Sequence, residues 1–153
     1  MILDPLIAAL RDTGTPVCVA EADRLHAAVP AGPGLRLHLR RAGLTPTDAA
    51  RIAAALTALP DSTRAALWSV SFSYNAQMGD PGAVALIGAL PMTAQELGMV
   101  GCGLTDASGE ALVAWLHGAQ ALRIVCVEDN AFSAPMRARI RGVFAGRSGL
   151  AVV

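Results

Sequence analysis

The chain repeats one alternation of apolar and polar residues four times. In each copy two apolar residues alternate with small or polar ones, and a landmark residue follows three positions after the second apolar residue. Such alternation over a few residues is typical of β-strands. A short strand is therefore predicted in each of the stretches 37–44, 70–75, 97–104 and 125–132, with the landmarks Ala42, Asn75, Cys102 and Asn130.

Each predicted strand is followed by the apolar stripe of a short helix. About ten residues beyond each landmark an apolar residue begins a pair at i, i+4 spacing, embedded in Ala-rich sequence. This spacing places both members on one face of a helix, which is then the buried face. The four pairs are Ile52 and Leu56, Leu86 and Leu90, Leu112 and Leu116, and Ile140 and Phe144.

The landmarks recur at a nearly constant interval, with separations of 33, 27 and 28 residues. The longer first interval is explained by one inserted residue and an extra linker at 60–64. A single strand–helix unit cannot bury its own apolar face, whereas stacked units share one continuous core. Each helix then acts as the crossover between parallel strands.

On these residues the chain resembles the leucine-rich repeat family, in its ribonuclease-inhibitor-like subtype. The family's strand pattern is L-x-x-L-x-L-x-x-N/C-x-L, and the resemblance covers residues 34–153. It is weakest in the first copy, where Gly34 replaces the opening Leu and Ala42 replaces the Asn or Cys. The resemblance implies an α/β solenoid with a curved parallel sheet on the concave side and helices on the convex side. It also implies a non-catalytic protein–protein recognition module.

Residues 1–33 do not follow the repeat and are predicted to form an N-terminal α/β cap. The cap is expected to contain a helix at 4–11, a strand at 16–20 and a helix at 21–29. Residues 34–153 are expected to hold four repeats and a terminal strand in one structural domain. Leu150 and Val153 are assigned to that strand because each lies 28 residues beyond an equivalent residue, Leu122 or Val125.

The polar strand positions are expected to point away from the helices, onto the concave side of the sheet. These positions are basic on the first strand, rich in Ser and Gly in the middle and acidic towards the last strand. Trp and Tyr residues, which are common interface hot spots, flank the middle. The predicted partner-binding residues are Arg36, His38, Arg40, Trp68, Ser71, Tyr74, Glu96 and Glu128. Alternatively, the charged residues only solvate an exposed sheet, and the tryptophan packs on the preceding linker.

No catalytic arrangement is predicted. Cys126 and His38 fall three strands apart, about 14 Å at the usual strand spacing, which is too far for proton transfer. Glu128 is expected to raise the pKa of the Cys126 thiol by like-charge repulsion. Cys102 is assigned a structural role, and no metal-ligand or phosphate-loop spacing occurs. We therefore expect no enzyme activity and no cofactor. Arg137 and Arg141 share one helix face, which is either solvated or meets an acidic partner.

Composition narrows the classes of partner. Twelve basic and twelve acidic residues give a formal charge of zero, which argues against nucleic-acid binding and a polybasic membrane anchor. Residues are 54% hydrophobic but 4% aromatic, so the core must consist of Ala, Leu, Val and Ile. No apolar run of about 18 residues suggests a membrane span.

The location and partner follow from the same observations. Three scattered cysteines and the lack of a basic start before the first apolar stretch favour a cytoplasmic protein, and the Ala/Arg/Gly-rich composition resembles that of high-GC bacteria. The expected partner is another protein. Two alternatives remain: a homodimer or structural assembly through an exposed C-terminal strand edge, and a fragment of an enzyme or effector lacking its catalytic domain.

Overall fold

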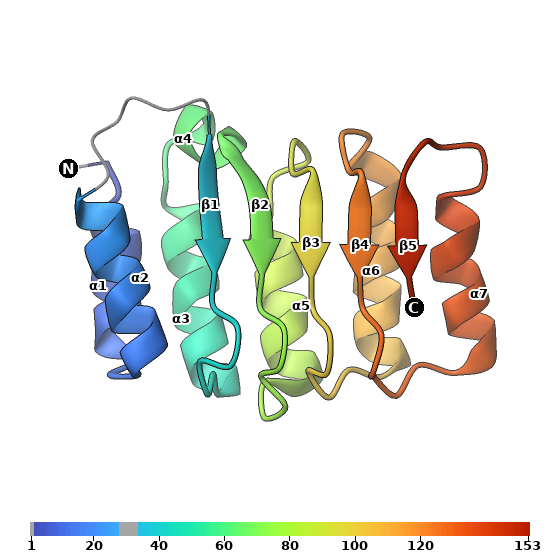
Figure 1. Cartoon of the computed structure of the whole chain (residues 1–153), viewed down its shortest axis with the longest axis horizontal. Coiled ribbons are helices and arrows are strands. Elements are labelled where there is room, and N and C mark those ends of the chain that lie inside the picture. The colour runs from blue at the N-terminus through green and yellow to red at the C-terminus, as the bar shows by residue number, and fades with distance from the viewer. Residues whose placement is uncertain (1, 28–33) are drawn as a thin grey trace.

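The computed structural model describes residues 2–27 and 34–153. In this part of the chain, twelve elements follow one another (Figure 1). They are α1 (Asp4–Asp12), α2 (Pro16–Ala27), β1 (Leu35–His38), α3 (Pro46–Thr57), α4 (Asp61–Ala65), β2 (Leu67–Ser71), α5 (Gly79–Ala89), β3 (Glu96–Gly98), α6 (Asp106–Gly118), β4 (Ile124–Cys126), α7 (Ala134–Val143) and β5 (Leu150–Val152).

The five strands form one parallel sheet in sequence order, which confirms the expected α/β class. Figure 1 shows helices α3, α5, α6 and α7 together on one face of this sheet. The opposite face, called the open face below, carries Arg36, His38 and Arg40 as exposed residues of and just beyond β1. Helix-side and open-side residues alternate along β1, β3 and β4, as the sequence pattern predicts, and along β2 from Ser69 onward, after a register shift at Trp68.

The core lies between the sheet and its helices. Leu37, Val70, Leu97 and Val125 pair in register across β1 to β4, and each is at most 2% exposed. All eight residues of the predicted helical stripes are also buried. Small residues bring the helices close together: a Cβ added to Gly82 would lie 3.0 Å from the Cβ of Ala49, at the contact of α5 with α3. This close packing explains how so few aromatic residues fill the core.

The landmark Asn75 joins the turn after β2 to the turn after β1 through hydrogen bonds. Its Oδ1 accepts hydrogen bonds from the backbone N–H groups of Ala42 at 3.0 Å and Leu44 at 3.1 Å. Its Nδ2 donates to the carbonyl oxygens of Leu39 at 2.9 Å and Phe72 at 2.6 Å. One buried amide thus pairs four backbone groups that leave the strand ladder where the chain turns away.

Asn130 repeats this arrangement two units later. Its Oδ1 accepts from the N–H groups of Cys102 and Leu104 at 2.9 and 3.1 Å, and its Nδ2 donates to the carbonyls of Met99 and Val127, both at 2.8 Å. Between the two asparagines, the thiol of Cys102 donates to a single neighbouring-strand carbonyl at 3.2 Å. The backbone-pairing role expected of the landmark residues is therefore observed at both asparagines.

The N-terminal segment differs from the prediction. Residues 16–20, expected to be a strand, form the first turns of α2, so the cap is helical over its described residues. The buried residues Cys18, Ala22 and Leu25 follow helical spacing, and Pro16 occupies the first position of the helix. Positions 28 and 29, where the second cap helix was expected to end, lie outside the described residues.

Helix α2 closes the outer edge of β1. The Glu21 carboxylate accepts the N–H of His38 at 3.1 Å, while Arg24 donates to the carbonyl of Arg36 at 2.7 Å. Arg24 also pairs with Glu21 through two further hydrogen bonds of 2.7 and 2.8 Å. These side chains occupy backbone groups through which an edge strand would otherwise pair with another chain.

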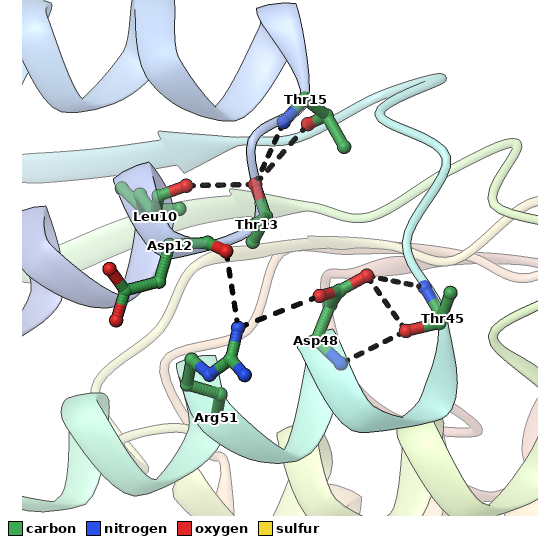
Figure 2. A network of polar contacts seen from close by, with 7 residues as sticks. All are labelled: Leu10, Asp12, Thr13, Thr15, Thr45, Asp48 and Arg51. Carbon is green, nitrogen blue, oxygen red and sulfur yellow. Dashed lines mark hydrogen bonds and ion pairs between the residues drawn. The ribbon is translucent and has the colours of Figure 1, made fainter.

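A second polar network ties α1 to the start of α3 (Figure 2). Thr45 and Asp48 form a capping box, in which each side chain accepts the other's backbone N–H. Arg51, one turn further along α3, reaches the carbonyl of Asp12 at the end of α1 at 3.3 Å. The capped helix thereby also positions the N-terminal helices beside the first strand–helix unit.

Strand β5 corrects a second expectation. Leu150 pairs with Ile124 rather than lying opposite Leu122, so β5 is shifted by two residues from the predicted register. Ala151 takes the core position beside Val125, and Leu150 is 56% exposed. The connection through α7 is shorter than its predecessors, and the constant interval assumed from the sequence therefore fails here. None of the described helices combines the length and apolar character needed to cross a bilayer.

Candidate recognition surface

The open face contains a shallow hollow of about 310 Å³ above β1 to β4. It lies over small side chains on β2 and β3, where Ser and Gly residues leave space between charged neighbours. Six of the eight predicted partner-binding residues line it: His38, Arg40, Ser71, Tyr74, Glu96 and Glu128. The strand alternation thus brings together residues that are separated by up to ninety positions in the sequence.

The other two predicted residues lie apart from this hollow. Arg36 is exposed in the row beside Ser69 but does not line it. Trp68 sits where the register between β1 and β2 shifts, and its indole packs against Gly34, at which an added Cβ would lie 2.4 Å from the ring. Strand alternation breaks at this shift, and the indole of Trp68 therefore lies beside the hollow rather than in it.

A chain of hydrogen bonds crosses the first three strands. The Ser69 hydroxyl donates to Glu96 at 2.7 Å and lies 2.9 Å from Nε2 of His38. Because the single hydroxyl proton goes to the carboxylate, Nε2 of His38 must be the donor to Ser69. This direction is opposite to that of a histidine base activating a serine. Burial lowers the pKa of His38 below its ordinary value, against the opposing attraction of Glu21.

Cys126 is separated from the imidazole on this face. It lies on β4, three strands from His38 on β1, as the sequence predicted. Burial is the largest cause that raises the pKa of its thiol, and the charges of Glu128 and Glu96 raise it further. The sequence identified the repulsion from Glu128 but not the larger effect of burial. The thiol is therefore protonated at neutral pH and a poor nucleophile.

Two guanidinium groups share one aromatic ring at the β1 end of the hollow. The Cζ atoms of Arg40 and Arg41 lie 5.3 and 4.7 Å from the ring centroid of Tyr74. Tyr74 is 38% exposed, and its ring packs beside Gly101, where an added Cβ would lie 3.3 Å from it. Arg41 follows the alternating positions of β1 rather than belonging to them, so it flanks the strand residues of the open face.

At the opposite end, Glu128 and Asp129 supply negative charge. The Oε2 atom of Glu128 is buried and has no hydrogen-bond partner among the described residues. Asp129 is exposed on the turn that follows. The predicted change from a basic first strand to an acidic fourth strand is therefore present along the edge of the open face at which the strands end, called the lower edge below.

The arginines of α7 and the turn after it make contacts within the chain. Arg137 donates to the carbonyl of Phe132 at 2.6 Å, and Arg139 pairs with Glu110. Arg141 donates to the last carbonyl of the chain, and Arg147 donates to two carbonyls at the C-terminal end of α6. These contacts hold the arginine side chains against the chain on the helical side, where Arg139 and Arg141 remain exposed. In the described parts of the chain, no three His, Cys, Asp or Glu residues gather as metal ligands would.

The open face carries the groups through which the chain could act. Its hollow is shallow, it holds charged and aromatic groups at fixed positions, and its thiol and imidazole lie on different strands. This arrangement suits non-covalent contact better than bond making. Neither a protein-family model nor a curated protein matches the sequence.

Proposed function

We propose that this chain is a non-catalytic protein-recognition module, a leucine-rich-repeat solenoid that binds a partner protein on its open, concave face. The matching bonds of Asn75 and Asn130 and the strand order support repeat stacking of this type. The observation that carries the function is the hollow in which six charged, polar and aromatic side chains meet. The three cysteines are free, which supports a cytoplasmic, reducing location.

Partner capture with a charge reversal tests this function. Arg40→Glu, at the basic end of the hollow, is expected to reduce partner retention at least about tenfold, because like charges across an interface are strongly unfavourable. Arg11→Glu on α1 is the matched control, since it breaks only an exposed ion pair with Asp23. Both variants are to be compared with the unmodified chain by crosslinking and quantitative mass spectrometry. Equal partner retention by all three proteins would refute the proposal.

A second candidate function is self-association through β5. It is favoured because α2 covers one edge of the sheet and no described strand pairs with the other. Helix α2 occupies the edge of β1, whereas no described strand lies beyond β5. Leu150 and Val152 bond to β4, so the N–H of Ala151 points to the free edge.

Sedimentation over a range of concentrations tests self-association through this edge. If β5 pairs with a second copy, the unmodified chain forms dimers. Ala151→Pro then makes the chain monomeric, since proline removes the outward donor. A monomer at every concentration would exclude this second function.

A further inference from the structure

The turns at the lower edge of the open face form a graded row of charge. The residue before each landmark adopts a left-handed conformation, with φ between 52° and 63°. From β1 to β4 these residues are Arg41, Tyr74, Gly101 and Asp129. The residues preceding the first and last of them are Arg40 and Glu128, so the row runs from two cations through an aromatic ring and a glycine to two anions.

The basic end is held in place without a counter-ion. Arg40 and Arg41 both stack on Tyr74, and neither forms an ion pair with a carboxylate among the described residues. Stacking restricts the guanidinium groups, so less entropy is lost when they bind an anion. Two like charges on one ring also repel each other, and a partner carboxylate would relieve that repulsion with charge-assisted hydrogen bonds.

The acidic end has the complementary need. A buried carboxylate oxygen without a donor costs free energy, and the Oε2 atom of Glu128 is in this position. Asp129 adds a second negative charge at the solvent edge. Because the Oε2 atom is buried, an ammonium or guanidinium group of a partner would pair with the carboxylate from the hollow, which Glu128 lines, and with the exposed Asp129.

Between the ends, the surface is low enough for a peptide backbone. A side chain at Gly98 would crowd the floor, since an added Cβ would lie 3.0 Å from Oγ of Ser73 and 3.1 Å from Oγ of Ser71. The two charged ends are three strand intervals apart, about 14 Å. An extended peptide advances about 3.4 Å per residue, so about four residues span this distance.

We propose that the open face binds an extended segment of the partner protein in which an acidic and a basic residue lie about four positions apart. The acidic residue pairs with Arg40 and Arg41, and the basic residue pairs with Glu128 and Asp129. This inference rests on the proposed recognition function and specifies the chemistry of the partner. Exposed charges of this kind act mainly on specificity and association rate, so the contact weakens with added salt.

Three fluorescein-labelled peptides test the inference with the chain of residues 1–153. The dipolar probe is Asp-Ala-Leu-Ala-Lys with fluorescein joined to its N-terminus through a neutral spacer and an amide at its C-terminus. Its controls are labelled and amidated in the same way and carry Asp at both ends or Lys at both ends. Fluorescence anisotropy at low ionic strength is expected to give roughly tenfold tighter binding of the dipolar probe than of either control, because each control places like charges together. Equal affinities for the three peptides would overturn the inference.

Charge-reversed proteins provide the compensating half of the test. Arg40→Glu with Arg41→Glu is expected to transfer the preference to the di-Lys peptide, and Glu128→Lys with Asp129→Lys to the di-Asp peptide. Arg11→Glu is expected to retain the original preference. If a reversed protein does not fold, Gln at Arg40 and Arg41 is expected to abolish the preference over the di-Lys peptide, and Gln at Glu128 and Asp129 to abolish the preference over the di-Asp peptide.

An unchanged preference in the folded variants would overturn the inference. The outcomes for the two proposals are separable. Loss of a partner protein on Arg40→Glu, together with equal affinity for all three peptides, would leave the recognition function standing and refute only the charge-spaced segment.

Discussion

The Oδ1 atom of Asn75 lies 3.0 Å from the backbone nitrogen of Ala42, on the turn of the neighbouring strand. The asparagine is only 2% exposed, so water cannot replace its hydrogen bonds when the side chain is removed. The same contact recurs between Asn130 and Cys102 at 2.9 Å. Stability is therefore expected to depend on the asparagines more than their small size suggests.

Asn75→Ala is expected to lower the free energy of unfolding by about 2–5 kcal/mol, because it leaves several buried backbone groups without partners. Cys102→Ala is the matched control, since its thiol is a weak donor, and a loss of about 1 kcal/mol is expected. Urea denaturation monitored by circular dichroism measures both values. Equal losses at the two positions would show that the amide does not fasten the turns.

The register of β5 can be tested by three leucine truncations. Leu97→Ala and Leu112→Ala, at residues 2% and 1% exposed, are each expected to cost about 2–5 kcal/mol. Leu150→Ala is expected to cost no more than about 0.5 kcal/mol, since this side chain is 56% exposed. Thermal and urea unfolding of the three variants would decide the point. A large loss at Leu150 would restore the register expected from the sequence.

The edge contact of α2 predicts a pH dependence of stability. Burial raises the pKa of Glu21, but hydrogen bonds from Arg24 and from the backbone of His38 outweigh it, so the net pKa is lowered. A lowered pKa in the folded state adds stability above the ordinary glutamate value of about 4.3, and this stability is lost as the pH falls through the folded value.

Glu21→Gln tests this dependence. The variant is expected to be about 1–3 kcal/mol less stable at pH 7, because Arg24 loses its charged partner. Its disadvantage should begin to shrink below about pH 4.3, where this glutamate binds a proton in the unfolded chain, and should vanish below the lowered pKa of Glu21 in the folded chain. Asp23→Asn on the same helix, at an exposed position, is the control. A constant stability difference between pH 7 and pH 3 would contradict the prediction.

Trp68 is expected to affect stability rather than binding. Its indole packs against Gly34, outside the hollow. Trp68→Ala should therefore lower the unfolding free energy by about 1–3 kcal/mol, less than for a fully buried tryptophan, and leave the affinity for the dipolar peptide unchanged. Peptide titration of the folded variant is the deciding measurement. Weakened binding would return the residue to the recognition surface.

Much of the architecture could be predicted from the sequence because the repeat fixes the local environment. Val70 and Leu97 recur at the same place in each unit and are both buried, as the alternation requires. The same alternation places His38 and Glu96 on the open face. Side chains that belong to a regular strand are therefore predictable from their position in the repeat.

Strand alternation gives a wrong prediction, or none, where the regular repeat ends. The apolar run of Val17, Cys18 and Val19, with two β-branched residues, imitates a strand, but these residues form a helix that packs on α1. Arg41 lies in a turn, where strand alternation gives no direction for its side chain. The bonds of Glu21 join residues of unrelated sequence pattern, and no local signal identifies such a pair.

The contact of Glu21 and Arg24 with β1 closes one edge of the sheet, so added repeat units would extend the sheet on the other side of β1. Because that boundary is sealed, tandem duplication of an internal unit would be accommodated between the seal and the final strand. Each added copy would widen the exposed surface by one strand spacing, about 4.8 Å. Such a surface changes in fixed increments, and each increment would suit a ligand longer by one or two residues.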